Sequence, residues 1–297
     1  MHSPSNQILT NDSQPLLQSV DWFSRTQSAP KTTVFAQTTQ ARQVDLDRFV
    51  IKIGSEWQVW RGPNGGYLAA LMLRTLMRRL NDPARQPRVL AVQFARPPLE
   101  GSTEIRTRLL RRGRSMTWMT AELLQQGEIC LIASAAFSSD WDGVEYQAVE
   151  KPVVPDLAAA IGPPREILPP FTANYEYLST FGVPLVPGQS DAVGGYIRPA
   201  QRQPYDAPML AAITDAWYPA TFAHDSSFVM GATLDLTIHF RDHKALHALE
   251  NEDHVLAVFR SKLAVEGFFE EDGELWSPEG RLLVQSRQLA LGKKITG

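Results

Sequence analysis

A two-residue alternation of inward and outward positions runs through residues 281–291, "RLLVQSRQLAL". Such alternation predicts a β-strand with one face on the core, and that face carries Leu282, Val284, Ser286, Gln288 and Ala290. Gln288 is unusual there, because a buried amide without hydrogen-bond partners costs about 1–3 kcal/mol. We therefore expect Gln288 to have specific partners or a specific task.

The same order of elements occurs twice along the chain. A helical run, "GGYLAALMLRTLMRRL" or "APMLAAITDAWYPATF", precedes a strand that ends near Phe94 or Phe240. Each half then closes with a long hairpin, and Gly127 and Gly280 occupy matching turns. One long helix and three or four antiparallel strands per half predict an α+β unit in which a curved sheet wraps the helix.

That arrangement is the hot-dog fold, and three stretches carry a family resemblance: "RGPNGGYLAALML", "ATLDLTIHF" and "GRLLVQSRQLAL". Over roughly residues 45–140 and 170–292, the sequence resembles the type II acyl-CoA thioesterases of the thioesterase-like superfamily. The resemblance implies a tandem (double) hot-dog protein that hydrolyses acyl thioesters and pairs into homodimers. We expect the two sheets to be continuous or edge to edge, because each half alone would expose strand edges.

Proline usage divides the chain, since eleven of the 21 prolines lie between Pro152 and Pro208. We predict a flexible N-terminal tail over residues 1–30 and an N-terminal hot-dog domain over residues 31–140. A Pro-rich linker over residues 141–169 would then lead to a C-terminal hot-dog domain over residues 170–297.

Composition excludes several classes of partner. A net charge of −3 offers no basic surplus for nucleic acid, and no apolar run approaches the ~20 residues that span a bilayer. The N-terminal segment has neither the charged start nor the apolar stretch of a secretory signal. The only cysteine, Cys130, is expected to be a buried small hydrophobe. These features predict a soluble protein in a reducing compartment, the cytoplasm.

Asp215 is the only ionisable residue between Asp206 and His224, within a run that is apolar or neutral on every side. A helix there would be buried, and Asp215 would face away from its main apolar stripe, toward the interface of the two halves. Burial tends to raise the pKa of a carboxyl toward the range of a general base. The alternative is a structural Asp held by backbone amides. We prefer catalysis, because an isolated acid in so apolar a helix is costly without a role.

In the family that the sequence resembles, an Asp, a Ser or Thr and a Gln activate the water that attacks the thioester. The resemblance assigns these roles to Asp215, Thr233 and Gln288, and Gln285 is set aside because alternation turns it to the other face. Strict alternation also turns Thr233 away from the pocket, so it reaches the site only at a strand start or a bulge.

The glycine turn "PNGGYLAALML" leads into a helix whose first N–H groups are free to bind an oxyanion. Substrate-binding candidates there are Asn64, Gly65, Gly66 and Tyr67, and the resemblance places this region at the acyl pocket. The equally supported alternative is a helix start capped by Asn64, with the glycines needed for backbone shape.

Other chemistries have less support. The histidines at 239, 243 and 247 lack an acidic residue at metalloprotease spacing, so we expect no metal site and no cofactor. The nearest approach to a serine nucleophile motif, "GQSDA" at residues 188–192, lies in a Pro-rich loop. Two rivals stay open: a hot-dog hydratase or dehydratase, with His224 as nearest candidate, and a non-catalytic module that binds acyl thioesters.

Overall fold

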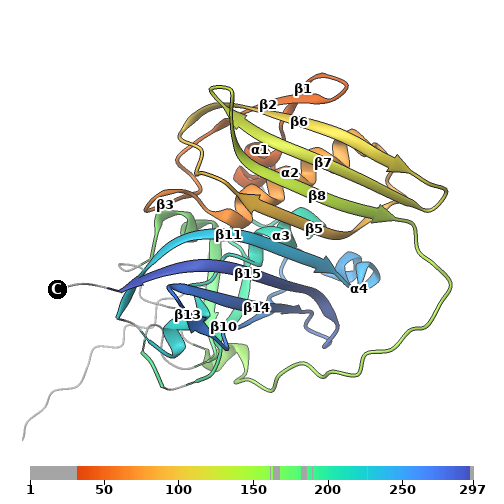
Figure 1. Ribbon diagram of the computed structural model, residues 1–297. Helices are drawn as coiled ribbons and strands as arrows, with labels where there is room; N and C mark the ends of the chain where they lie inside the picture. The colour runs from red at the N-terminus through yellow and green to blue at the C-terminus, as the bar shows by residue number, and fades with distance from the viewer. Residues whose placement is uncertain are drawn as a thin grey trace, which may run out of the picture.

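The computed structural model describes residues 32–160, 162, 168–181, 186–188, 190–225 and 227–294. The predicted tail over residues 1–30 lies outside the described residues. A 13-stranded antiparallel sheet runs through both halves of the chain, and the helices α2 and α3 pack together (Figure 1).

In the N-terminal half, the strand order is β1-β2-β6-β7-β8-β5. The strands and helices are α1 (Val34–Thr39), β1 (Arg42–Asp45), β2 (Arg48–Ile53), β3 (Gln58–Val59), β4 (Gly62–Pro63), α2 (Gly65–Leu80), β5 (Gln86–Phe94), β6 (Gly101–Arg112), β7 (Met116–Gln125) and β8 (Glu128–Ser138). The short strands β3 and β4 pair with each other, outside the main sheet.

In the C-terminal half, the order is β11-β15-β14-β12-β10-β9, and β13 pairs with β14. The elements are η1 (Leu157–Ala159), η3 (Pro170–Asn174), β9 (Tyr175–Ser179), β10 (Val193–Pro199), α3 (Ala207–Ile213), η4 (Ala220–Ala223), β11 (Phe228–Phe240), α4 (His243–Ala248), β12 (Val255–Arg260), β13 (Ala264–Val265), β14 (Phe268–Trp276) and β15 (Leu282–Lys294), where η denotes a 3₁₀ helix.

The two halves meet at β5 and β11, the strands that follow α2 and α3. Leu236 and Ile238 of β11 lie opposite Val92 and Leu90 of β5 in an antiparallel pair. The two strands lie side by side at the centre of the sheet in Figure 1. Because each of these strands is the edge of its own half, their pairing covers both edges. The prediction of two hot-dog units with a continuous sheet is confirmed.

The helix α2 occupies the core of the N-terminal half. Asn64 caps it by accepting a hydrogen bond from the Tyr67 amide, and the left-handed Asn81 ends it. Its first three turns are buried nearly all round, because it lies between the sheet and α3. This packing places the N-terminus of α2 at the boundary between the halves.

The second helix is shorter than the sequence pattern predicts. The run over residues 207–222 begins as a helix capped by Asp206, but α3 ends at Ile213 and a 3₁₀ helix starts at Ala220. Pro219 excludes one continuous helix through residue 222, since a proline disfavours the helical conformation in the residue before it and has no N–H to donate. Asp215 therefore lies in a turn just after α3, not within a helix.

The segment that follows β8 runs along the outside of the molecule to the C-terminal half (Figure 1). Gln147 and Lys151 donate hydrogen bonds to the carbonyl oxygens of Gly280 and Pro278, in the turn before β15. The predicted linker over residues 141–169 thus begins as an extended strap held against the second half. No helix in the described part of the chain is long and apolar enough to span a bilayer.

Candidate active site

Asp215 faces the N-terminus of α2 across the boundary between the halves. Its carboxylate Oδ2 accepts hydrogen bonds from the Gly66 amide at 2.9 Å and from Asn64 Nδ2 at 3.0 Å. Asn64 Nδ2 also donates to the main-chain oxygen of Asp215 at 2.7 Å. The turn after α3 is therefore fastened to the start of α2 through both side chain and main chain.

Glycine at position 66 makes this close approach possible. A Cβ atom there would lie 2.4 Å from the carbonyl oxygen of Ala212 and 2.9 Å from Cβ of Asp215. Both distances are far below ordinary contact, and the first atom belongs to the backbone of α3. The start of α2 can approach the end of α3 closely enough for the Gly66 amide to bind Asp215 only because residue 66 has no side chain.

The electrostatics suit Asp215 to accept a proton near neutral pH. Burial is the main influence and raises the pKa of Asp215 to about 6, against the amides of Gly66 and Gly65 and the side chains of Gln288 and Asn64, which lower it. The residue as a whole keeps some contact with solvent. A carboxylate with a pKa of about 6 is well placed to act as a general base.

Gln288 lies beside Asp215 on the inner face of β15. It is only 4% exposed, and its amide is among the groups that lower the pKa of Asp215. Its Oε1 accepts a hydrogen bond from Thr233 Oγ1 at 3.3 Å. The structure thus brings Asp215, Thr233 and Gln288 together, while Gln285 lies on the opposite face and accepts a hydrogen bond from Arg241.

Thr233 reaches this face because β11 is irregular there. The register of β11 against β15 shifts on both sides of Thr233, between Met230 and Thr233 and again between Thr233 and Asp235. Such a bulge changes which face a side chain points to. The conflict between strict alternation and a pocket position for Thr233 is resolved by this bulge.

A second buried carboxylate, Glu271 on β14, belongs to the same cluster and was not among the sequence candidates. Its Oε1 accepts a hydrogen bond from Gln288 Nε2 at 2.6 Å, and its Oε2 accepts one from the Ala220 amide at 2.5 Å. Burial is the main cause that raises its pKa to about 7, and the charge of Asp215 adds to the rise. Alternation could have found it, because Phe269, Glu271 and Leu275 share the buried face of β14.

The predicted oxyanion donors already have partners in this structure. The Gly66 amide binds Asp215, and the Tyr67 amide donates to Asn64 Oδ1 at 2.9 Å, so Asn64 does cap the helix. The Gly65 amide lies close enough to lower the pKa of Asp215. Asn64, Gly65 and Gly66 therefore border the acid directly, and Tyr67 belongs to the cap behind them.

Aromatic rings form a row beside the acid. Successive ring pairs have centroids 5.1–5.9 Å apart and join Trp57 with Tyr67, Trp57 with Tyr175, Tyr175 with Tyr177, and Tyr177 with Trp217. The charge of Asp215 contributes to the raised pKa values of Tyr175 and Tyr177, so both phenols lie near it. This row gives the acid an apolar surrounding, which strengthens electrostatic interactions within the site.

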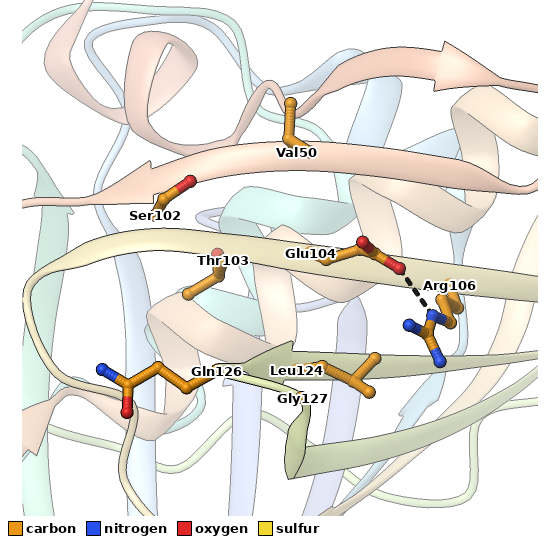
Figure 2. A pocket seen from close by; sticks show the side chains of 8 residues that line it. All are labelled: Val50, Ser102, Thr103, Glu104, Arg106, Leu124, Gln126 and Gly127. Carbon is orange, nitrogen blue, oxygen red and sulfur yellow. Dashed lines mark hydrogen bonds and ion pairs between the residues drawn. The ribbon is translucent and has the colours of Figure 1, made fainter.

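The other candidates lie elsewhere. His224 is exposed, and its Nε2 is 2.9 Å from the carbonyl oxygen of Ser261, a neutral partner. Within the described ranges, no three His, Cys, Asp or Glu residues are grouped as metal ligands would be. A hollow of about 220 Å³ on β2, β6 and β7 contains the ion pair of Glu104 and Arg106 but none of the predicted site residues (Figure 2).

Comparisons with known proteins assign a domain family to each half of the chain. Residues 53–138 match the acyl-CoA thioesterase N-terminal domain, and residues 149–291 match the acyl-CoA thioesterase C-terminal domain. A comparison with curated protein sequences gives no significant match.

Several solved structures have a similar fold, and each aligns with this chain over nearly its whole length. A hot-dog protein of unknown function from Alicyclobacillus acidocaldarius has a TM-score of 0.80 at 26% identity, covering 89% of this chain and 100% of its own. The acyl-CoA thioesterase II TesB2 of Mycobacterium marinum has a TM-score of 0.71 at 18% identity, covering 89% and 99%. The tesB protein of Mycobacterium avium subspecies paratuberculosis has a TM-score of 0.71 at 19% identity, covering 87% and 98%. With both domain families matched over most of its length, the chain belongs to the acyl-CoA thioesterase family and is a thioester hydrolase with a double hot-dog fold.

Proposed function

We propose that the chain hydrolyses acyl-CoA, or a related acyl thioester, to free acid and thiol with a water molecule activated by Asp215, Thr233 and Gln288. The observation that carries this proposal is the carboxylate of Asp215. Its Oδ2 accepts hydrogen bonds from Gly66 and Asn64, and in this proposal Oδ1 takes the proton from water. A base with a pKa of about 6 is ionised at neutral pH and still basic enough to assist the attack.

The reaction needs no covalent intermediate on the protein. As Asp215 takes the proton, the water oxygen forms a bond to the thioester carbonyl carbon, and the carbonyl oxygen becomes an oxyanion. Collapse of this intermediate breaks the carbon–sulfur bond, and the thiolate leaves and recovers the proton from Asp215. Because a thiolate is a good leaving group, a separate general acid is not required.

The amide and the hydroxyl orient the water. Thr233 donates to Gln288 Oε1, which turns Gln288 Nε2 toward the side of Asp215 and Glu271. We place the thioester carbonyl against residues 64–67, at the N-terminus of α2, where the positive end of the helix dipole favours a developing negative charge. Asn64, Gly65, Gly66 and Tyr67 are thus the proposed border of the thioester.

The test is release of thiol from a panel of acyl-CoA substrates, with hydration of an enoyl-CoA measured in parallel. Thiol release by the wild-type protein supports the proposal, whereas hydration without thiol release would assign a hydratase. Binding of acyl-CoA with neither reaction would identify a non-catalytic module.

The proposal also covers the oligomeric state of the protein and the compartment in which it works. We propose a homodimer, which a monomeric mass in light scattering at micromolar concentration would contradict. We also propose a reducing compartment such as the cytoplasm, because Cys130, the only cysteine in the sequence, is buried as a small hydrophobe.

A further inference from the structure

Glu271 is a carboxylate on a face of β14 that otherwise belongs to the core. It is only 6% exposed, and Phe269 and Leu275 on the same face are 2% and 0% exposed. Placing a charge among such neighbours is unfavourable unless donors surround it. The residue therefore has a specific set of partners, and those partners belong to the candidate active site.

Each oxygen of Glu271 binds a different part of that site. Oε1 accepts from Nε2 of Gln288, which lies directly opposite Glu271 in the pairing of β14 with β15. Oε2 accepts from the amide of Ala220, the first residue of η4. Because Ala220 follows Asp215 in the same connection after α3, Glu271 joins the segment of the base to the strand of Gln288.

An ionised carboxylate also settles which way the Gln288 amide faces. A carboxylate only accepts hydrogen bonds, so the NH₂ group of Gln288 must turn toward Glu271 and the carbonyl toward Thr233. One N–H of Nε2 then serves Glu271, and the other faces Asp215, whose pKa the Gln288 amide lowers by hydrogen bonding. A flipped amide would present its oxygen to the carboxylate and lose both bonds.

We propose that Glu271 is a positioning residue for thioester hydrolysis, which holds the Gln288 amide and the Asp215 segment in the arrangement that orients the attacking water. This inference rests on the proposed function. Glu271 itself acts through Gln288 and Ala220 and has no contact with substrate in the mechanism.

The charge of Glu271 has a second, measurable effect on Asp215. The charges that act on Glu271 come from Asp215, after α3, and from Glu270, its neighbour on β14, whereas β15 and η4 supply the neutral donors of Gln288 and Ala220. Asp215 in turn faces Glu271 and the neutral groups of α2 and β15. Glu271 has the higher pKa of the two, so it is still protonated where Asp215 titrates, and its own ionisation near pH 7 adds a second step that Glu271→Gln lacks.

The decisive variant is Glu271→Gln. Its amide has one oxygen, so it accepts from Gln288 or from Ala220 but not from both, and the other contact becomes donor against donor. We expect kcat for acyl-CoA hydrolysis to fall about 10- to 100-fold with KM changed less than about threefold. The acid limb of the kcat/KM profile should move from the pKa of Glu271, about 7, toward that of Asp215, about 6, because the variant no longer needs Glu271 to ionise. The matched control is Glu274→Gln on the outward-facing side of β14, which should leave both values unchanged.

A structural role alone would give a different pattern. If Glu271→Gln keeps kcat within about threefold per folded molecule and leaves the acid limb in place, the inference is overturned, whatever happens to the melting temperature. Should this variant fail to fold, Glu271→Asp keeps the charge but shortens the reach. A lowered kcat with an unmoved acid limb would then support the inference, and a normal kcat would overturn it.

A readout without catalysis separates this inference from the proposed function. Titration of the Asp215 carboxyl carbon by ¹³C NMR should show a second step near pH 7 in the wild type, from the ionisation of Glu271, and no such step in Glu271→Gln. An inactive wild-type protein would contradict the proposed function, whereas the same Asp215 titration in both proteins would contradict the coupling of Glu271 to the site.

Discussion

The amide nitrogen of Gly66 lies 2.9 Å from Oδ2 of Asp215, although 149 residues separate them in the chain. The first residue belongs to α2 of the N-terminal half, and the second follows α3 of the C-terminal half. Gln288, which hydrogen-bonds Asp215, and Thr233, which donates to Gln288, also come from the C-terminal half. The candidate site is therefore assembled only when the two halves are packed together.

The change Asp215→Asn keeps the shape of the side chain and removes the base. Thioester hydrolysis should fall about 10²- to 10⁴-fold while circular dichroism and gel filtration stay those of wild type. The reason is that an amide cannot accept the proton of the attacking water. Thiol release from acyl-CoA measures the effect, and activity of the folded variant within about threefold of wild type would show that Asp215 is not the base.

The pH profile follows from the ionisation of Asp215. Only the carboxylate form accepts a proton, and burial raises the pKa of Asp215 to about 6. We therefore expect kcat/KM to rise as the pH increases through about 6. Because Glu271 titrates nearby, the limb reports the coupled pair and not one residue alone. A limb near pH 4, the range of an ordinary carboxyl, would contradict the raised pKa.

The same raised pKa predicts how stability depends on pH. Asp215 holds its proton more tightly in the folded chain than in the unfolded chain, whose pKa is near the usual 3.8. Between these two values, the folded state binds more protons, so the contribution of Asp215 to stability decreases as pH rises. Asp215→Asn does not titrate, and its melting temperature relative to wild type should therefore increase between pH 4 and pH 8. A relative melting temperature that decreases over this range would indicate an ionised Asp215 that stabilises the fold.

Gln288→Ala tests whether the amide and the base act as one unit. Loss of the Gln288 amide should lower kcat, because the attacking water then lacks the donor that orients it. The double variant with Asp215→Asn should be little worse than Asp215→Asn alone, since effects within one catalytic unit are not additive. If the fold-reductions in thiol release of the two single variants multiply in the double variant, Gln288 has a role separate from that of Asp215.

Patterns local to one strand or one turn were readable from the sequence. Two-residue alternation alone placed Gln288 on the inner face of β15, where the structure buries it. The order of helix and strands in each half likewise predicted two α+β units. These features depend on residues within a few positions of one another, so a periodic pattern carries them.

Contacts between distant segments were not readable in this way. Asn64 was recognisable as a helix cap, but its bonds to Asp215 depend on the approach of α2 to α3. Glu271 lies within "FFEEDGELW", where neighbouring acids suggest a solvated hairpin and conceal the one that faces inward. The bulge that turns Thr233 inward arises from pairing with β15 and leaves no local sign beyond the conflict in alternation.

Gly66→Ala should damage both the fold and the chemistry through one added methyl group. Its Cβ would lie 2.4 Å from the Ala212 carbonyl oxygen, a backbone atom, so α2 and α3 must separate. Such overpacking costs about 1–3 kcal/mol in the free energy of unfolding. The separation also lengthens the Gly66–Asp215 hydrogen bond, which holds the pKa of Asp215 down, so the acid limb of kcat/KM should move to higher pH.

The matched control for this variant is Gly143→Ala, because a Cβ at Gly143 meets nothing within 4 Å. It should leave the melting temperature and the pH profile unchanged, as its added methyl group points into open space. Thermal unfolding and pH-dependent thiol release measure both effects on the same samples. If Gly66→Ala lowers stability but leaves the acid limb of its folded fraction in place, the Gly66 amide does not control the ionisation of Asp215. If the acid limb moves to higher pH in Gly66→Ala but not in Gly143→Ala, the start of α2 in one half controls the ionisation of Asp215 in the other half.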